Sequence, residues 1–133
     1  MVKVFNMKVK GSMEALHREI KQMGAKPPVS TVVPALISCG VFPATAVPCL
    51  VMSYCGEQLQ LTGGKIASGL RKAVKVAIRK FHYDSTCCHH DLHPGNLVLD
   101  STGAVKVVDL ASMAAATTAE RTAELQAFCR EYM

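Results

Sequence analysis

Apolar residues recur at helical spacing in three segments of the chain. The first predicts a helix from about residue 13 to 23, capped by Ser12 and ended by Gly24. Its expected buried face consists of Met13, Leu16, Ile20 and Met23. At about 100° per residue, Glu19 lies about 60° to one side of Leu16. We therefore expect its carboxylate at the edge of the buried face, within reach of an inward partner.

The second helical segment runs from about residue 66 to 82. Its expected inward residues are Leu70, Ala73, Val74, Ala77, Ile78 and Phe81. The opposite face carries Lys72, Lys75 and Arg79, which could contact nucleic acid, although a solvated face explains them at least as well. Nucleic-acid binding is therefore disfavoured, with a basic α+β module of that kind kept as an alternative.

The third helical segment closes the chain. Thr117 and Glu120 have the spacing of a capping box and predict a helix that runs to Met133. Its expected buried face is Leu125, Phe128, Cys129 and Tyr132. We interpret this helix as a cap over apolar surface, which a partner chain or a second copy could extend.

Short alternating segments predict strands. Residues 2–5 alternate, with Val2 and Val4 on one face and Lys3 on the other. Further strands are expected at 32–33 with 35–39, and at 49–54. Residues 97–100 and 104–109 flank Ser-Thr-Gly, which predicts a β-hairpin.

Composition narrows the class of protein. A chain of 133 residues makes one domain, and its net charge of +5 suits anionic partners such as nucleotide phosphate, RNA or an acidic lipid surface. The six cysteines form no C-x-x-C pair, and the first ten residues lack the apolar region of a signal peptide. Reduced thiols in a cytoplasmic protein are the expectation.

Residues 27–56 carry no charge, which invites a membrane interpretation. Five of the six prolines lie in this segment, at positions 27, 28, 34, 43 and 48. The apolar runs between them are shorter than the roughly 20 residues that a spanning helix needs. We expect no membrane span here, and short buried strands instead.

The candidate chemistry lies in residues 89–110. Asp91 and Asn96 belong to a loop that contains Pro94 and Gly95, and Asp109 ends the second strand of the hairpin. Because a hairpin returns the chain on itself, Asp109 is expected beside Asn96, with Asp91 a few residues away. Carboxylate and amide oxygens suit Mg²⁺, and a separate carboxylate can accept a proton from a hydroxyl. Ordinary turn chemistry is the alternative for each residue taken singly.

This segment resembles the protein-kinase-like superfamily. The catalytic loop of that family has the form H-x-D-x-x-x-x-N, which His89, Asp91 and Asn96 match, and Asp109 follows Asn96 by the typical thirteen residues. The run His-Asp-Leu-His-Pro-Gly-Asn is most similar to aminoglycoside- and choline-kinase-like enzymes and to atypical protein kinases. The resemblance implies that Asp91 is the base, that His89 orients the loop, and that Asn96 and Asp109 bind Mg²⁺.

The resemblance extends towards the N-terminus. Lys3 resembles the strand lysine that grips the α- and β-phosphates, and Glu19 resembles the helix glutamate that pairs with it. Residues 50–56 resemble the hinge strand, which implies Met52 as gatekeeper and backbone bonds from Tyr54 and Cys55 to adenine. His93 is expected to contact a phosphate from the rim of the site, with a simple surface histidine as the alternative.

The implied fold is α+β, an incomplete protein-kinase-like fold. We expect one truncated domain, 1–133, with a partial N-lobe and hinge at 1–56 and a shortened C-lobe at 57–133. The implied activity is transfer of the γ-phosphate of ATP, with Mg²⁺, to a protein or small-molecule hydroxyl.

Three departures from the family keep a second hypothesis open. The chain begins two residues before Lys3, so no Gly-rich loop precedes it, and only 24 residues follow Asp109. Leu110-Ala111 replaces the usual Phe-Gly, and alanine lacks the access of glycine to positive φ. An inactive pseudokinase or partner-binding module is therefore the alternative. A zinc site at Cys87, Cys88 and the nearby histidines is disfavoured, because adjacent ligands rarely share one tetrahedral ion.

Overall fold

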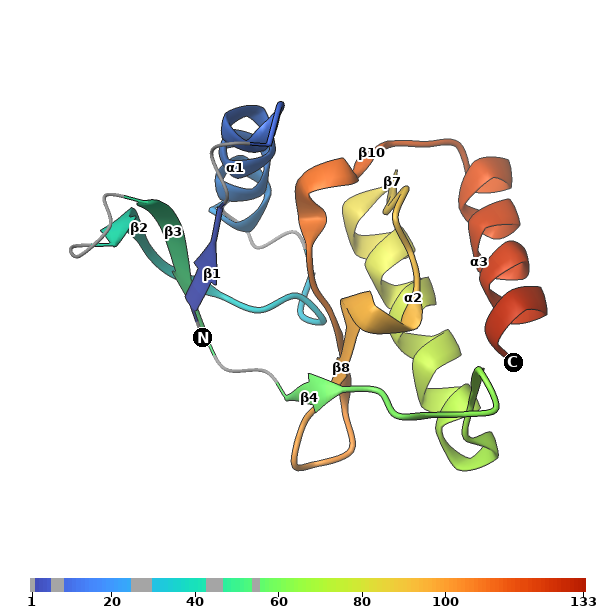
Figure 1. Cartoon of the computed structure of the whole chain (residues 1–133). Helices are drawn as coiled ribbons and strands as arrows, with labels where there is room; N and C mark the ends of the chain where they lie inside the picture. The colour runs from blue at the N-terminus through green and yellow to red at the C-terminus, as the bar shows by residue number, and fades with distance from the viewer. Residues whose placement is uncertain (1, 6–8, 25–29, 43–46, 54–55) are drawn as a thin grey trace.

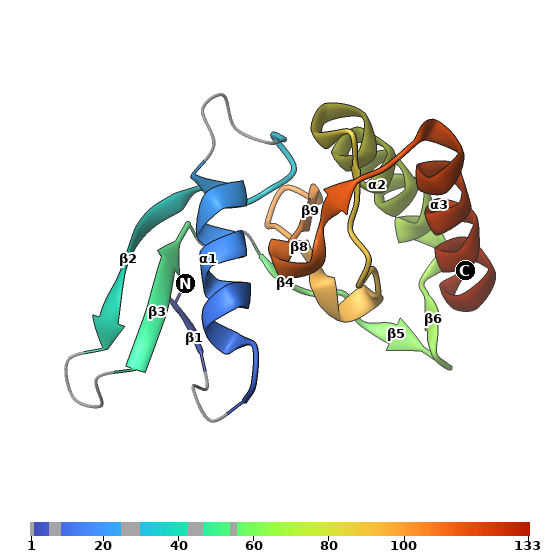
Figure 2. The same cartoon turned by 90° about the horizontal axis from the view of Figure 1, so that it is seen from above.

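The structure is a computed structural model that describes residues 2–5, 9–24, 30–42, 47–53 and 56–133. Its elements form two parts that lie side by side in both views (Figures 1 and 2). One part is a small sheet with one helix, and the other contains two helices and short strands. Every strand pair is antiparallel, as the expected α+β class implies.

The first part is a three-stranded sheet covered by helix α1 (Ser12–Met23). The strand order is β1 (Val2–Val4), β3 (Val47–Met52) and β2 (Leu36–Phe42), with Lys3 opposite Leu50. Its small buried core consists of Phe5, Leu16, Leu50 and Met52. The alternation of β1 therefore leaves Val2 and Val4 half-exposed, while the next residue along, Phe5, packs in this core.

Helix α1 differs from the expectation at its first turn. The N-cap is Gly11 in the left-handed region, with φ of 86°, so the prediction that Ser12 caps the helix is wrong. Met13 is 40% exposed, because the buried face begins one turn later, at Leu16. Glu19 is only 1% exposed, deeper than the predicted edge of the face. Gly24 ends the helix, as expected.

The second part packs helices α2 (Arg71–Ser85) and α3 (Thr118–Tyr132) around a larger core. Its main sheet has the order β4 (Glu57–Gln58), β8 (Leu97–Leu99) and β9 (Val105–Val107). The predicted hairpin is confirmed, with Leu97 opposite Val107. The most deeply buried members of this core are Ile66, Val74, Ile78, Phe81, Leu97, Val107 and Leu110.

Two smaller strand pairs complete the second part. Strands β5 (Leu61–Thr62) and β6 (Lys65–Ile66) form a tight hairpin, and β7 (Cys87–Cys88) pairs with β10 (Ala114–Ala115). The capping box of Thr117 and Glu120 is present at the start of α3, so this prediction is confirmed.

Two predicted elements have different limits. Residues 32–33 lie in a turn rather than a strand; Pro34 lacks an N–H for a ladder, and both valines pack against the larger core. The helix expected from residue 66 begins as an α-helix only at Arg71 and continues to Ser85. Ile66 belongs to β6, and a 3₁₀ turn at Ser68–Leu70 precedes the helix.

The charge-free segment supplies strands β2 and β3, as expected. None of the helices in the described part of the chain combines the length and apolar character that a bilayer span requires. Tyr54 and Cys55, the expected adenine-contacting residues, lie outside the described residues.

Gly56 generates a stability prediction. Its φ is 125°, and a Cβ at this position would overlap the carbonyl group of Leu99. We expect Gly56→Ala to lower the free energy of unfolding by about 3 kcal/mol, from backbone strain and overpacking together. The matched control is Gly103→Ala, at φ of 82° with nothing within 4 Å of the Cβ, which should cost about 1 kcal/mol. Equal losses in urea unfolding would contradict the clash.

Candidate active site

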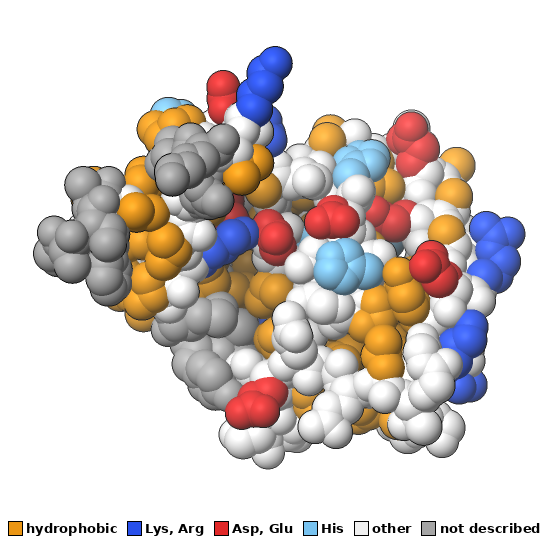
Figure 3. Space-filling view, in the orientation of Figure 1, with side chains coloured by type: hydrophobic (Ala, Val, Ile, Leu, Met, Phe, Trp, Pro, Cys, Tyr) orange, Lys and Arg blue, Asp and Glu red, His pale blue; other side chains and the backbone are white. Residues whose placement is uncertain are grey.

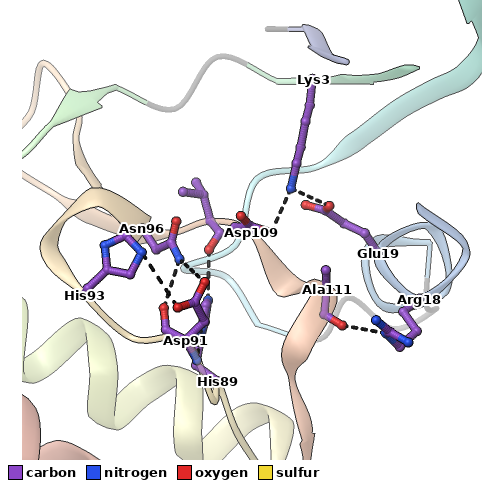
Figure 4. A network of polar contacts seen from close by, with 10 residues as sticks. Lys3, Arg18, Glu19, His89, Asp91, His93, Asn96, Asp109 and Ala111 are labelled. Carbon is purple, nitrogen blue, oxygen red and sulfur yellow. Dashed lines mark hydrogen bonds and ion pairs between the residues drawn. The ribbon is translucent and has the colours of Figure 1, made fainter. Parts of the chain in front are cut away.

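The ammonium group of Lys3 joins three segments that are far apart in the sequence. Its Nζ lies 2.6 Å from Oε2 of Glu19 on α1 and 2.7 Å from Oδ1 of Asp109, beyond the end of β9. Figure 4 shows the Lys3 side chain extending from its strand to the two carboxylates. One cation thus links β1, α1 and the end of the β8–β9 hairpin.

The burial of these groups sets their electrostatics. Burial raises the pKa of the Glu19 carboxyl, and the bond to Lys3 offsets this only in part. For Lys3, burial opposes the charged form, but the hydrogen bonds to Asp109 and Glu19 and their negative charges outweigh it and raise its pKa. Lys3 therefore stays charged, because it is paired with two carboxylates at once.

Asp109 occupies a backbone position that is unusual for most residues. Its φ is 62°, in the left-handed region that Asp and Asn tolerate better than other non-glycine residues. A 3₁₀ turn, η3 (Leu110–Ser112), follows and buries Leu110. The positive φ thus occurs at Asp109 and not at Ala111. The main-chain carbonyl of Ala111 accepts a 2.8 Å hydrogen bond from Nε of Arg18 on α1.

His89 holds the loop of residues 89–96 from inside. Its side chain is fully buried; Nε2 lies 2.9 Å from the Val108 carbonyl, and Nδ1 accepts a 3.3 Å bond from the Asp91 amide. A carbonyl can only accept, so the proton of the neutral ring is on Nε2. His89 thereby ties the start of the loop to the residue before Asp109.

Asn96 brings the end of the loop back to Asp91. Its Nδ2 donates a 2.9 Å bond to the Asp91 carbonyl and lies 3.4 Å from Asp91 Oδ2. The main-chain carbonyl of Asn96 accepts a 3.0 Å hydrogen bond from the Val108 amide. Asn96 therefore lies beside Val108, the residue that precedes Asp109. The hairpin thus brings Asp91, Asn96 and Asp109 into one region, as the sequence predicted, and Figure 4 shows them together.

Glu124 on α3 is a site-supporting residue that the sequence analysis missed. Its carboxylate accepts bonds from the amides of His89 (3.0 Å) and His90 (2.7 Å) and lies 2.6 Å from Nε2 of His82 on α2. Burial opposes its charge, but these three partners lower its pKa. The sequence pattern that could have predicted this position is the spacing to Phe128. Glu124 precedes the buried Phe128 by four residues, so both side chains lie on the inner face of α3.

The remaining predicted residues lie as follows. His93 is at the rim of the loop, 43% exposed, with Nε2 3.9 Å from Asp91 Oδ1. Met52 is 3% exposed at the end of β3 and packs in the small core. In Figure 3, acidic, basic and histidine side chains gather where the two parts meet.

The cysteine and histidine cluster shows no metal geometry. Within residues 2–5, 9–24, 30–42, 47–53 and 56–133, no three His, Cys, Asp or Glu side chains are placed to hold one ion. Cys88 is buried in β7, and burial raises the pKa of its thiol to about 11.

Comparison with known proteins identifies a fold rather than a family. No family model and no curated protein sequence matches the chain. Among solved structures, monomeric WbdD and a co-crystal of WbdD with the kinase inhibitor LY294002 each match with a TM-score of 0.64 and 18% identity. Both matches cover 98% of this chain, and they cover 33% and 32% of the respective neighbours.

A third neighbour is described as the bifunctional kinase-methyltransferase WbdD, with the same TM-score and identity over 31% of its length. The chain therefore spans about a third of these neighbours. At this level of identity the match shows the fold alone, and it agrees with the kinase-like fold expected from the catalytic-loop resemblance.

The Lys3 bridge generates the first prediction for this site. Lys3→Met would leave the buried Glu19 without a cation, and we expect the free energy of unfolding to fall by about 2 kcal/mol. This loss is smaller than for a fully buried ion pair, because Lys3 and Asp109 are partly exposed to solvent. The pKa of Glu19 is already raised, so this carboxyl should become protonated as pH falls. The stability difference between Lys3→Met and the wild type should therefore become smaller at lower pH. Exposed Lys10→Met is the control; a similar loss there would contradict the bridge.

The support from Glu124 generates a second prediction. Glu124→Ala leaves two loop amides without their acceptor, so we expect a loss of about 2–3 kcal/mol and faster hydrogen exchange at His89 and His90. The lowered pKa of Glu124 means that its contribution is present above its ordinary value of 4.5 and is lost as pH falls through the folded-state value. Exposed Glu14→Ala should change neither quantity; unchanged exchange in Glu124→Ala would refute this role.

Proposed function

We propose that this chain is the core of a kinase-like phosphotransferase that binds Mg·ATP and transfers the γ-phosphate to a hydroxyl of a protein or small molecule. The observation that carries the proposal is the ammonium of Lys3 bound to Glu19 and Asp109 at 2.6 and 2.7 Å. These residues come from three distant segments, and turn chemistry gives no reason for them to meet. The catalytic-loop geometry and the shared fold with WbdD support it.

Lys3 has the role of phosphate clamp. A partly exposed ammonium, held on its inner side by a buried carboxylate, presents positive charge to phosphate oxygens. Glu19 fixes the direction of the side chain and supplies the negative charge that keeps it protonated. A nucleotide phosphate would replace Asp109 as the second partner of Lys3, which frees that carboxylate for a metal.

Asn96 and Asp109 are the proposed metal ligands. Their donor atoms, an amide oxygen and a carboxylate, fit Mg²⁺, which prefers hard oxygen ligands and keeps several waters. The amide nitrogen of Asn96 faces Asp91, so the oxygen of the same group is the atom left for the metal. When bound, the ion neutralises charge on the transferring phosphoryl group.

Asp91 is the proposed base. Its side chain is 56% exposed, so an acceptor can reach it, while its backbone is held by His89 and Asn96. As the acceptor oxygen bonds to the γ-phosphorus, its proton passes to Asp91 and ADP leaves with the electrons of the broken P–O bond. Most of the acceleration comes from positioning and charge, which a rigid loop supplies.

The adenine site is proposed from the resemblance and the neighbours together. Met52 ends the strand that leads to residues 54–55, whose backbone is the expected partner of adenine. WbdD has been crystallised with the kinase inhibitor LY294002. That compound is therefore a suitable competitor for this chain, because binding here would displace ATP.

An inactive, partner-binding module is the second candidate. Strand β1 is an edge of the described sheet, so no described strand continues the sheet beyond Lys3. Lys3 and Asp109 are 29% and 39% exposed. Phosphoryl transfer requires that water is excluded from the site. The exposure of Lys3 and Asp109 therefore favours a chain that binds nucleotide without transferring phosphate.

Mg·ATP binding and label transfer test the proposal. At a Mg·ATP concentration ten times its Kd, we expect the melting temperature to rise by about 4 °C, from about 1.4 kcal/mol of binding energy. Asp109→Asn should abolish the rise, since it removes the charge while Asn still tolerates the left-handed backbone. Asp91→Asn should keep the rise and lose transfer of radiolabelled phosphate.

The controls separate the two candidates. Exposed Glu14→Gln should match the wild type in both assays. A stable wild-type protein with no temperature shift at millimolar Mg·ATP rules out nucleotide binding. A shift without transfer to water or to added alcohols supports the inactive module instead.

A further inference from the structure

We propose that His93 donates a hydrogen bond that holds the acceptor hydroxyl against Asp91. The role rests on the phosphotransfer proposed above and assigns a residue to the acceptor side of that site. It departs from the sequence-based expectation, which gave His93 a phosphate of the nucleotide.

The loop fixes which ring nitrogen carries the proton. His93 caps the 3₁₀ turn η2 (Pro94–Asn96), and its Nδ1 accepts a 3.1 Å bond from the Gly95 amide. In a neutral imidazole one nitrogen accepts and the other donates. Nε2 of His93 therefore carries the hydrogen, and its lone-pair nitrogen is already used. His93 is a donor here and has no free lone pair with which to act as a base.

Gly95 leaves room for the ring and holds it through its backbone amide. A Cβ at this position would stand 2.8 Å from Cε1 and 2.9 Å from Nδ1 of His93, too close for either atom. The backbone of Gly95 is not at positive φ, so the glycine provides space for the ring in this position rather than a special backbone conformation. The ring lies directly over Gly95, and its direction is set before any substrate arrives.

The gap between His93 and Asp91 fits one oxygen atom. Nε2 and Oδ1 are 3.9 Å apart, too far for a direct hydrogen bond. A hydroxyl oxygen about 2.8 Å from each can accept from Nε2–H and donate its own proton to Oδ1. Both side chains are accessible, 43% and 56% exposed. This is the hydroxyl that loses its proton to Asp91 as its oxygen attacks phosphorus.

The two oxygens of Asp91 face different groups. Oδ2 is the one near Nδ2 of Asn96, at 3.4 Å, and Oδ1 is the one near His93. In Figure 4, Asn96 and Asp109 lie between His93 and Lys3. The proposed phosphate clamp is thus across the site from His93, which is why the ring belongs to the acceptor rather than to the nucleotide.

Two substitutions separate the donor from the cap. His93→Asn keeps an oxygen that can accept from the Gly95 amide but loses the Nε2 donor, whereas His93→Gln places an amide donor near the position of Nε2. We expect both variants to bind Mg·ATP within twofold of wild type. With water as the acceptor, ATP turnover should fall about tenfold in His93→Asn, the value of one hydrogen bond, and less in His93→Gln.

The ring itself gives a readout that needs no activity. Nitrogen NMR of the histidine side chains should show His93 as the Nε2–H tautomer in the free protein. The Nδ1–H tautomer would overturn the proposal even if the protein hydrolyses ATP. Weaker Mg·ATP binding with unchanged turnover in His93→Asn would indicate that His93 contacts the nucleotide. That result would also overturn the proposal. A wild-type protein that shows the expected tautomer but transfers no phosphate to water or to added alcohols would refute the phosphotransfer, and the acceptor role with it.

Discussion

A buried carboxylate that needs a cation is the constraint on which the site depends. Glu19 is almost completely buried, and a carboxylate in such a place is tolerated only when it is paired and hydrogen-bonded. Lys3 supplies that charge and also binds Asp109. The Lys3 side chain therefore links the sheet, helix α1 and the end of the hairpin, and the candidate phosphate and metal groups are positioned by the same contact.

The loop of residues 89–96, the candidate catalytic loop, is fixed by a separate set of contacts. Buried His89 ties it to Val108, Asn96 closes it onto Asp91, and Glu124 accepts from two of its amides. Each contact satisfies a backbone group, so the loop is rigid although it has little regular structure. Asp91 can thus be both exposed and well placed, a combination that a base needs.

Periodicity predicted the elements whose burial pattern is regular. The buried face of α2, the hairpin and the capping box of α3 follow from local sequence patterns alone. Local rules failed where contacts elsewhere in the chain decide. Gly11 rather than Ser12 is the N-cap residue of α1, and residues 32–33 pack on the larger core instead of joining a sheet. The resemblance suggested that Lys3 and Glu19 pair, but the additional bond to Asp109 and the support from Glu124 depend on how the two parts meet, which spacing does not encode.

We expect that binding of a nucleotide moves Lys3 from Asp109 to phosphate while Asp109 turns to the metal. Paramagnetic line broadening by Mn²⁺, added with a non-hydrolysable ATP analogue, measures this most directly. We expect strong, nucleotide-dependent broadening of the amide signals of Leu97 and Leu110, which adjoin the two proposed ligands, and weaker broadening at Leu125 on α3. Uniform broadening, or broadening centred on α3 with none at Leu97 and Leu110, would contradict it.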